Sequence, residues 1–417
     1  MNHAPIARME YEILGEEKKL ITMPSFKADV EIKIKDQNGN VKFERTQPFR
    51  SFVGNFTHVL NHCFFNQSIA AKLKDVDNAS GTATTFKMDV KESAPTYASD
   101  NSLYGIWIGN VTNNSGISNL TQNSDMGSDI AYADYNLNTF IDNYNTADAA
   151  DTKIAYGATS VTFGSDSVLT ISRTFTNNNT TAIKISEIGL VAKTNNTEYL
   201  LIARDTIDDG SNDYVSVAAS YIIDINYKFS VTSSSGFTKN FVRLLSSHFN
   251  GGDTVESIVN SIGGAGTIDV TTGRAEQDMM ASTSEDNYGL LVGGYTSLAG
   301  AVNPSLSNNA YKLASKLDDS DLTHGAVSAL NTSDITISGD YTIIGCQRDF
   351  TNPSSTDTVY VFEAGLFMHN DTASLNYMIS RLLTGSSGLT YVAVQPGKIL
   401  RLKYYLAFPI STKDTSR

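Results

Sequence analysis

The chain has 417 residues and a net charge of −13, and only 18% of its residues are charged. This acidic balance excludes nucleic acid as a main partner, because phosphate binding needs clustered Lys and Arg and no basic run is present. The N-terminus lacks the apolar region of a secretion signal, and no stretch approaches the roughly 18 apolar residues of a membrane span. The sequence therefore predicts a protein that is made in the cytoplasm and does not insert into membranes.

The first strand pattern lies within residues 1–50. In the segment ADVEIKIKDQNGNVKFERT, Val30 and Ile32 alternate with charged residues. Asn38 and Gly39 then supply a two-residue turn, and the alternation resumes beyond them. We therefore predict a β-hairpin extension over residues 1–50 that packs on the first domain.

The rest of the chain repeats itself. GNFTHVLNHCFFN at residues 54–66 matches KNFVRLLSSHFNG at residues 239–251, and later landmarks such as YGIWIGN against YGLLVGG follow in the same order. Such internal repetition indicates two like-folded domains in tandem, which we place at residues 51–235 and 236–417. Apolar residues recur at three- and four-residue spacing in both opening segments, so each domain is predicted to open with a short amphipathic helix.

The later segments of each copy favour strands. SVLTISRTF, TAIKISEIGLVA, TEYLLIARDT and SYIIDINYKFSV carry β-branched residues in alternation or in short apolar runs, punctuated by Gly, Asn and Asp. The predicted fold is mainly β, with two tandem homologous domains of β-sandwich or barrel-like form. Long polar inserts occur at Thr112–Thr152 and Ser297–Asn331, and the second contains a predicted helix in AYKLASKL.

A Glu-x-Gly-Leu signature followed by Arg recurs in both copies. The shared residues are Glu187, Gly189 and Arg204 in the first copy and Glu363, Gly365 and Arg381 in the second. If the two strands pair antiparallel, each Glu can face its Arg as an ion pair, and each Gly fits a bulge or a close backbone approach. A functional interpretation makes Glu an acid and Arg an electrostatic stabiliser. Because a catalytic pair need not appear twice, we interpret both pairs as structural.

Three groups of residues raise the question of a metal site. The segment DTIDDGSNDY gathers the carboxylates of Asp205, Asp208, Asp209 and Asp213. This chemistry suits calcium, but the EF-hand spacing is missing. His58 and His62 stand one helical turn apart without the Glu of an HExxH motif, and Cys63 and Cys346 fit no metal-type spacing. We predict buried cysteines and no cofactor, with a calcium-stabilised loop as the alternative.

The chain carries no nucleophile or phosphate-loop motif. GxSxG, GxxxxGK and a Rossmann GxGxxG with its acidic partner are all missing. Glycosidase carboxylates can be scattered in sequence, yet the single tryptophan, Trp107, argues against a sugar-stacking cleft. We predict that the protein is not an enzyme, and a carbohydrate-cleaving activity ranks behind two non-enzymatic hypotheses.

The end of each copy resembles a module of structural proteins in tailed bacteriophage particles. The resemblance rests on the EIGL strand after an FTN turn, a strand ending in Ala203-Arg204, and a final strand such as INYKF or LRLKYYLAF; the second copy departs at Ala364 and Ser380. Those proteins are tail, neck or capsid-associated subunits without a catalytic role. The resemblance implies a virion protein that forms a homo-oligomer and contacts other virion proteins.

The alternative is a host-surface adhesin or a fibre-associated protein. In this hypothesis the polar inserts Thr112–Thr152 and Ser297–Asn331 contact a host glycan, because long loops that carry many polar residues and tyrosines are often functional.

Overall fold

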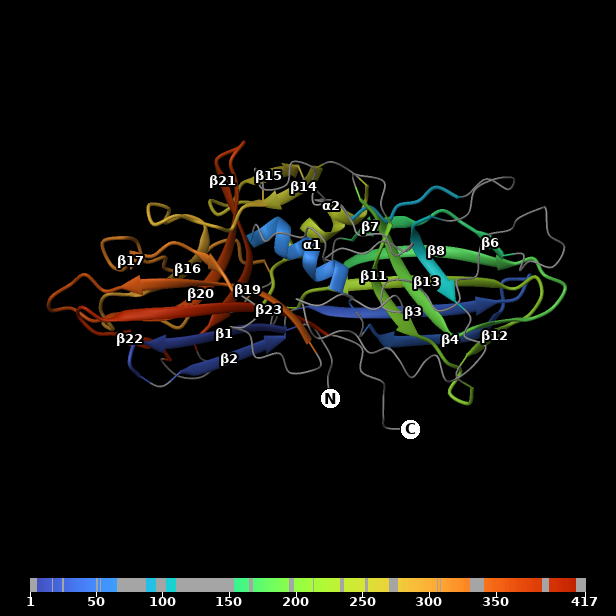
Figure 1. The fold of residues 1–417 in the computed structure, drawn as a ribbon, viewed down its shortest axis with the longest axis horizontal. Helices are drawn as coiled ribbons and strands as arrows, with labels where there is room; N and C mark the ends of the chain where they lie inside the picture. Colours follow the sequence, from blue (N-terminus) through green and yellow to red (C-terminus); the bar gives the residue numbers. More distant parts are fainter. Residues whose placement is uncertain are drawn as a thin grey trace.

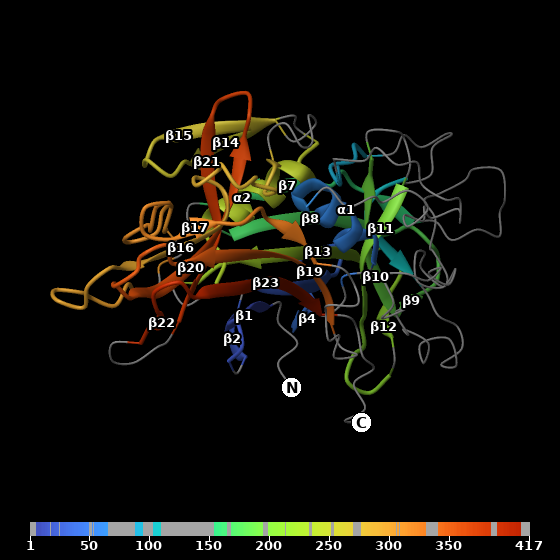
Figure 2. The same cartoon turned by 60° about the vertical axis from the view of Figure 1, so that its left-hand side comes forward.

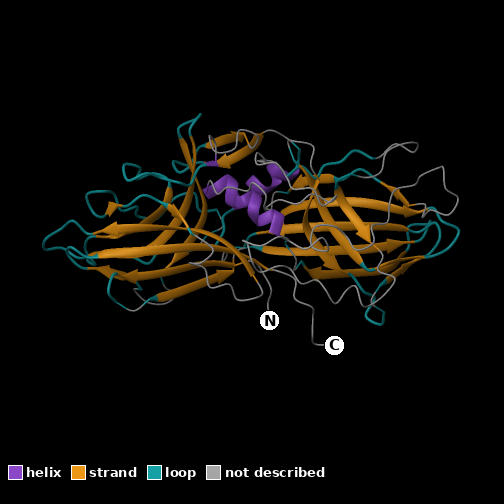
Figure 3. Cartoon of the chain, viewed as in Figure 1, coloured by secondary structure: helices purple, strands orange, loops and turns teal. Residues whose placement is uncertain are grey.

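In the part of the chain that the structure describes, the computed structural model has two β-rich halves with two helices between them (Figure 1). The structure describes residues 6–16, 18–24, 26–49, 52, 54–65, 88–94, 103–109, 154–164, 168–194, 199–212, 214–232, 236–251, 254–269, 277–305, 307, 309–330, 341–384 and 390–409. The helices are α1 (Gly54–Phe65) and α2 (Lys239–Phe249), and they stay between the halves in both views (Figures 2 and 3). Neither is long and apolar enough to cross a membrane, nor is any other helix in the described ranges.

The largest sheet of each half is antiparallel and has the same strand order. In the first half the order is β4 (Val41–Pro48), β3 (Lys27–Lys35), β13 (Ile222–Ser230), β8 (Val168–Asn177) and β6 (Ile154–Tyr156), with β7 (Ser160–Phe163) also on β8. In the second half it is β2 (Lys19–Pro24), β1 (Ile6–Ile13), β23 (Ile399–Pro409), β19 (Tyr341–Thr351) and β17 (Thr323–His324), with β18 (Ser328–Ala329) also on β19.

Smaller antiparallel sheets complete each half. The first half adds β5 (Gly105–Gly109), β10 (Glu187–Lys193) and β11 (Tyr199–Thr206), and the pair β9 (Ile183–Ile185) and β12 (Val215–Val217). The second half adds β16 (Gly289–Tyr295), β20 (Val359–Asn370), β21 (Leu375–Leu383) and β22 (Val392–Val394), and the hairpin β14 (Thr254–Val259) and β15 (Ala265–Asp269). The chain is mainly β and of β-sandwich type, as predicted. No sheet closes into a barrel within the described part of the chain.

The N-terminal strands are divided between the two halves. The hairpin β3–β4 lies on β13 of the first half, with Val30 opposite Tyr227. In contrast, β1 lies on β23, where Met9 takes the equivalent place opposite Tyr404. The expectation that residues 1–50 pack as a whole on the first domain is therefore wrong for residues 6–24. Two like sheets offer two like edges, and local sequence cannot specify which edge a strand joins.

The two helices pack across the junction between the halves. α1 contacts β11 of the first half and β19 of the second, while α2 contacts β7 and β8 of the first half as well as β14 and β21. Phenylalanine rings fill the centre. The ring centroid of Phe26 lies 5.7 Å from those of Phe237 and Phe241, and the ring centroid of Phe408 lies 5.2 Å from that of Phe56. One apolar cluster therefore runs through both halves.

The structure contradicts the predicted helix in AYKLASKL. The segment instead lies along the edge of β16, where Gly294 N donates to Ser315 O and Leu317 N donates to Val292 O. Leu313 and Leu317 are both buried, so the spacing that suggested a helix also suits an extended segment that covers a sheet. Backbone bonds to β16 replace the bonds that a helix would make within itself.

Candidate functional site

The structure brings Glu187 and Arg204 together inside the first half. In the antiparallel pair β10–β11, Arg204 lies opposite Gly189 and therefore next to Glu187 on the same face. Arg204 Nε and Nη2 both donate to Glu187 Oε2, at 3.0 and 2.9 Å. Neither side chain is more than 3% exposed, so the pair has no access to a substrate.

The second half contains the same pair with an added role. Arg381 Nε donates to Glu363 Oε2 at 2.5 Å, and Arg381 Nη1 donates to Ser305 O at 2.9 Å. Glu363 Oε1 accepts a hydrogen bond from Ala314 N at 2.6 Å. The buried pair therefore also holds the backbone at Ser305 and Ala314 to the sheet.

The signature glycine of the second copy is a site of close approach. The bulge expected in the signature lies on the partner strand, because the register shifts between Leu190 and Val191 and again between Leu366 and Phe367. At Gly365, an added Cβ would lie 2.9 Å from the ring of Phe367. This close packing leaves no room for a side chain.

Sequence reasoning missed two glycines that make room for the glutamates. A Cβ on Gly109 would lie 2.5 Å from Glu187 Cγ, and one on Gly293 would lie 2.6 Å from Glu363 Oε1. The signal was present in the matched segments YGIWIG and YGLLVG, which end in these residues.

Sequence reasoning also missed two buried arginines, Arg173 and Arg348, in the matched segments ISRTFTN and GCQRDFTN. Arg173 Nη1 donates to the carbonyl of Ile106 at 3.0 Å, and Arg348 Nη1 donates to that of Leu290 at 3.1 Å. Each arginine thus ties the large sheet of its half to the smaller one. Burial lowers the pKa of Arg348 to about 10.

The asparagine of each FTN turn is a buried connector. Asn177 Nδ2 donates to Val217 O at 2.9 Å, and Asn352 Nδ2 donates to Val394 O at 2.8 Å. Both asparagines are fully buried. The repeated polar residues of both copies therefore make their contacts inside the protein.

One buried hydroxyl differs between the copies. Tyr404 Oη lies 2.5 Å from Ser380 Oγ, whereas the equivalent positions in the first half are held by Tyr227 and Ala203. Among the described residues, the Tyr227 hydroxyl has no hydrogen-bond partner. A buried hydroxyl without a partner costs stability.

Replacing Ala203 with Ser is therefore expected to stabilise the protein by about 1 kcal/mol. The new hydroxyl would give Tyr227 the contact that Ser380 gives Tyr404. Denaturant unfolding measures the gain. The gain should vanish in a Tyr227→Phe background, and a gain of equal size there would show that the hydroxyl pair is not its cause.

The acidic segment that suggested calcium is a hydrogen-bonded turn. Arg45 Nη1 donates to Asp208 Oδ1, and Asp209 Oδ1 accepts from the backbone N–H groups of Ser211 and Asn212. Asp205 is buried, and Asp213 lies outside the described residues. Within the described ranges, no group of three or more His, Cys, Asp or Glu side chains is placed to hold a metal ion.

Of the remaining residues singled out in the sequence, His62 is half-buried and the others are in the core. His58 is buried in α1, and Trp107 is buried in β5. Cys63 and Cys346 are buried and form no disulfide, as predicted for small apolar residues. Burial raises the pKa of both thiols to about 12. The insert Thr112–Thr152 lies outside the residues that the structure describes.

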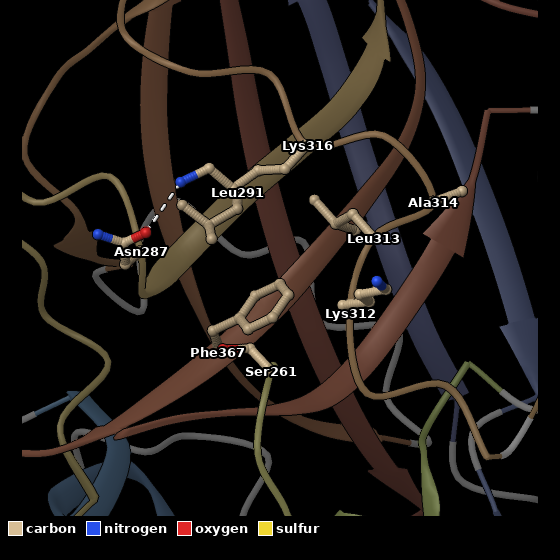
Figure 4. A pocket seen from close by; sticks show the side chains of 8 residues that line it. All are labelled: Ser261, Asn287, Leu291, Lys312, Leu313, Ala314, Lys316 and Phe367. Atoms are coloured by element: carbon tan, nitrogen blue, oxygen red, sulfur yellow. Dashed lines mark hydrogen bonds between the residues drawn. The ribbon is translucent and has the colours of Figure 1, made fainter. Parts of the chain in front are cut away.

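A pocket of about 290 Å³ opens beside β16 in the second half (Figure 4). Its lining residues are Ser261, Asn287, Leu291, Lys312, Leu313, Ala314, Lys316 and Phe367. Leu291, Leu313 and Phe367 are buried and give it an apolar floor. At the rim, Lys316 Nζ donates to Asn287 Oδ1 at 2.9 Å and to Asp286 Oδ2 at 3.0 Å. Four of the lining residues belong to the insert Ser297–Asn331, a link that the sequence did not reveal.

The comparisons with known proteins identify no relative. No family model, no curated protein and no solved structure matches the chain.

Proposed function

We propose that the chain is a non-enzymatic structural protein of a tailed bacteriophage particle. It is made in the host cytoplasm, assembles with copies of itself and contacts other particle proteins in the tail, neck or capsid. The observation that carries this proposal is that the repeated polar residues are buried and bind one another inside the protein. The Glu187–Arg204 and Glu363–Arg381 pairs are buried ties between strands, and such residues serve a scaffold rather than chemistry at a surface.

Two like halves also suit assembly. A chain that repeats one surface twice can present two nearly equivalent contacts to a neighbour, so that one subunit fills the place of two. The resemblance of each copy's end to phage structural modules supports the same interpretation.

Light scattering after size exclusion tests this proposal, with the full chain measured with and without calcium. A discrete oligomer of fixed mass in both conditions is the expected result. A monomer at all concentrations would contradict self-assembly, and an oligomer that forms only with calcium would revive a structural calcium loop.

The pocket beside β16 favours a second function, in which the insert Ser297–Asn331 binds a host glycan as an adhesin. The variant Lys312→Glu changes the charge at the pocket rim, where the side chain of Lys312 is exposed. If particles that carry this variant assemble but no longer adsorb to host cells, adhesion is supported. Normal adsorption would count against it.

A further inference from the structure

Histidine replaces tyrosine at one matched position of the two halves. Tyr156 lies opposite Phe175 in the first half, and His324 lies opposite Phe350 in the second. Each ring packs edge-on against its phenylalanine. The ring centroids of Tyr156 and Phe175 lie 4.7 Å apart with an interplanar angle of 81°, and those of His324 and Phe350 lie 5.6 Å apart with an angle of 69°. A residue that does not ionise near neutral pH is thus matched with one that does.

The glycine after each ring accepts a hydrogen bond from the buried arginine. Arg173 Nε donates to Gly157 O at 2.8 Å, and Arg348 Nε donates to Gly325 O at 2.7 Å. The ring and the guanidinium therefore occupy equivalent places in both halves, which makes the first half an internal reference for the second.

The charge balance around the two arginines differs. Arg173 Nη2 forms a 2.7 Å ion pair with the Glu92 carboxylate. Arg348 Nη2 instead donates to backbone carbonyls, those of Ser282 at 3.1 Å and of Glu285. Within the described part of the chain, Arg348 has no carboxylate at hydrogen-bond distance. A second positive charge next to it would be poorly compensated.

His324 is where such a charge can arise. Its side chain is fully buried, its Nδ1 contacts Asp319, and its Nε2 has no hydrogen-bond partner among the described residues. Arg348 on β19 opposes protonation of the ring, while Asp319 and Asp286, from the turn before β17 and the loop before β16, favour it. Burial is the largest influence and lowers the pKa of His324. Asp319 is half exposed, so water screens its charge.

We propose that His324 makes the β17 edge of the second half an acid-released element, in which mild acid detaches residues 318–325 from β19. The strand β17 is only two residues long and lies at the edge of its sheet, and the residue after it, Gly325, is bonded to Asp349 O and Arg348 Nε of β19. Detachment exposes Leu322 and Phe350, which are buried when the edge is docked. Acid thereby uncovers an apolar surface on one half only.

The sign of the pH dependence follows from the lowered pKa. The detached segment titrates near the ordinary histidine value of about 6.5, and the docked segment titrates below it. Between these two values the detached form binds a proton and the docked form does not, so docking weakens as the pH falls. Above about 6.5 both forms are neutral, and docking has its full strength.

Hydrogen exchange on the full chain at pH 7.5 and 5.0, corrected for intrinsic rates, tests the proposal with matched amides. Gly325 N donates to Asp349 O, and the equivalent Gly157 N donates to Thr174 O. Protection of the Gly325 amide should fall in acid by up to about tenfold for each pH unit within the window, while the Gly157 amide keeps its protection.

The variant His324→Tyr installs the residue of the first half and should abolish the acid effect. Equal protection of the Gly325 amide at both pH values in the wild type would overturn the proposal, as would an acid effect that persists in the variant. If the variant fails to fold, a titration of carbon-13-labelled histidine in the wild type decides instead. A midpoint for His324 at or above the ordinary value overturns the proposal, and a lower midpoint supports it.

Discussion

Deleting residues 1–24 is expected to unfold the second half of the chain before the first. The deletion removes β1 and β2, leaves β23 unpaired along one edge, and exposes the core beneath Ala7, Met9 and Ile13, which are buried. Loss of these side chains and of a row of strand hydrogen bonds costs on the order of 5 kcal/mol, comparable to the whole stability of many domains. Hydrogen exchange should show lost protection in β19 and β23 first.

Two single variants provide the control for this deletion. Met9→Ala and Val30→Ala truncate equivalent positions, opposite Tyr404 and Tyr227 respectively. Met9→Ala should weaken the protection of backbone amides from hydrogen exchange mainly in β23, and Val30→Ala should weaken it mainly in β13. Loss of protection in β13 and β3 after the deletion, with β23 intact, would contradict the strand assignment.

Replacing Glu187 with Leu is expected to destabilise the protein by about 3 kcal/mol or more, because the guanidinium of Arg204 stays buried without its carboxylate. The double variant Glu187→Leu/Arg204→Met should recover most of this loss, since apolar side chains of similar size often replace a buried pair at little cost. Thermal and denaturant unfolding measure both changes.

The second copy allows the same cycle at Glu363 and Arg381. There the double variant should recover a smaller share of the lost stability than in the first copy, because Glu363 also accepts from Ala314 N and Arg381 also donates to Ser305 O. A melting temperature unchanged by Glu187→Leu would show that the pair does not stabilise the fold.

Much of the architecture could be predicted from the repetition within the sequence. Each opening helix has apolar residues at helical spacing, and α1 and α2 bury them as the pattern requires. The recurrence of Glu and Arg at nearly the same separation, 17 residues in the first copy and 18 in the second, placed each pair on neighbouring strands, where the structure has it. These features depend on local periodicity and on pairing between strands that are close in the chain.

Contacts between distant segments could not be predicted in this way. β1 joins β23 from the other end of the chain, and nothing in its own alternation distinguishes that edge from the edge of β13. The buried Arg173 and Arg348 were missed because strand positions occupied by arginine usually face solvent. Their repetition in both copies was the available signal. The segment AYKLASKL was mistaken for a helix because its leucines suit either structure.

The central structural claim is that the N-terminal strand completes the second half. Glu10 lies directly opposite Lys403, and the place equivalent to Lys403 in the first half is held by Asn226, which lies opposite Glu31. Opposed residues on antiparallel strands are close enough for a disulfide. The native Cys63 and Cys346 are buried and should not interfere.

The most direct test is therefore disulfide formation under mild oxidation in paired cysteine variants. Glu10→Cys/Lys403→Cys should cross-link within the chain, as should the reference pair Glu31→Cys/Asn226→Cys, while Glu10→Cys/Asn226→Cys should not. A cross-link between positions 10 and 226, with none between 10 and 403, would contradict the account and place the N-terminal strand on the first half.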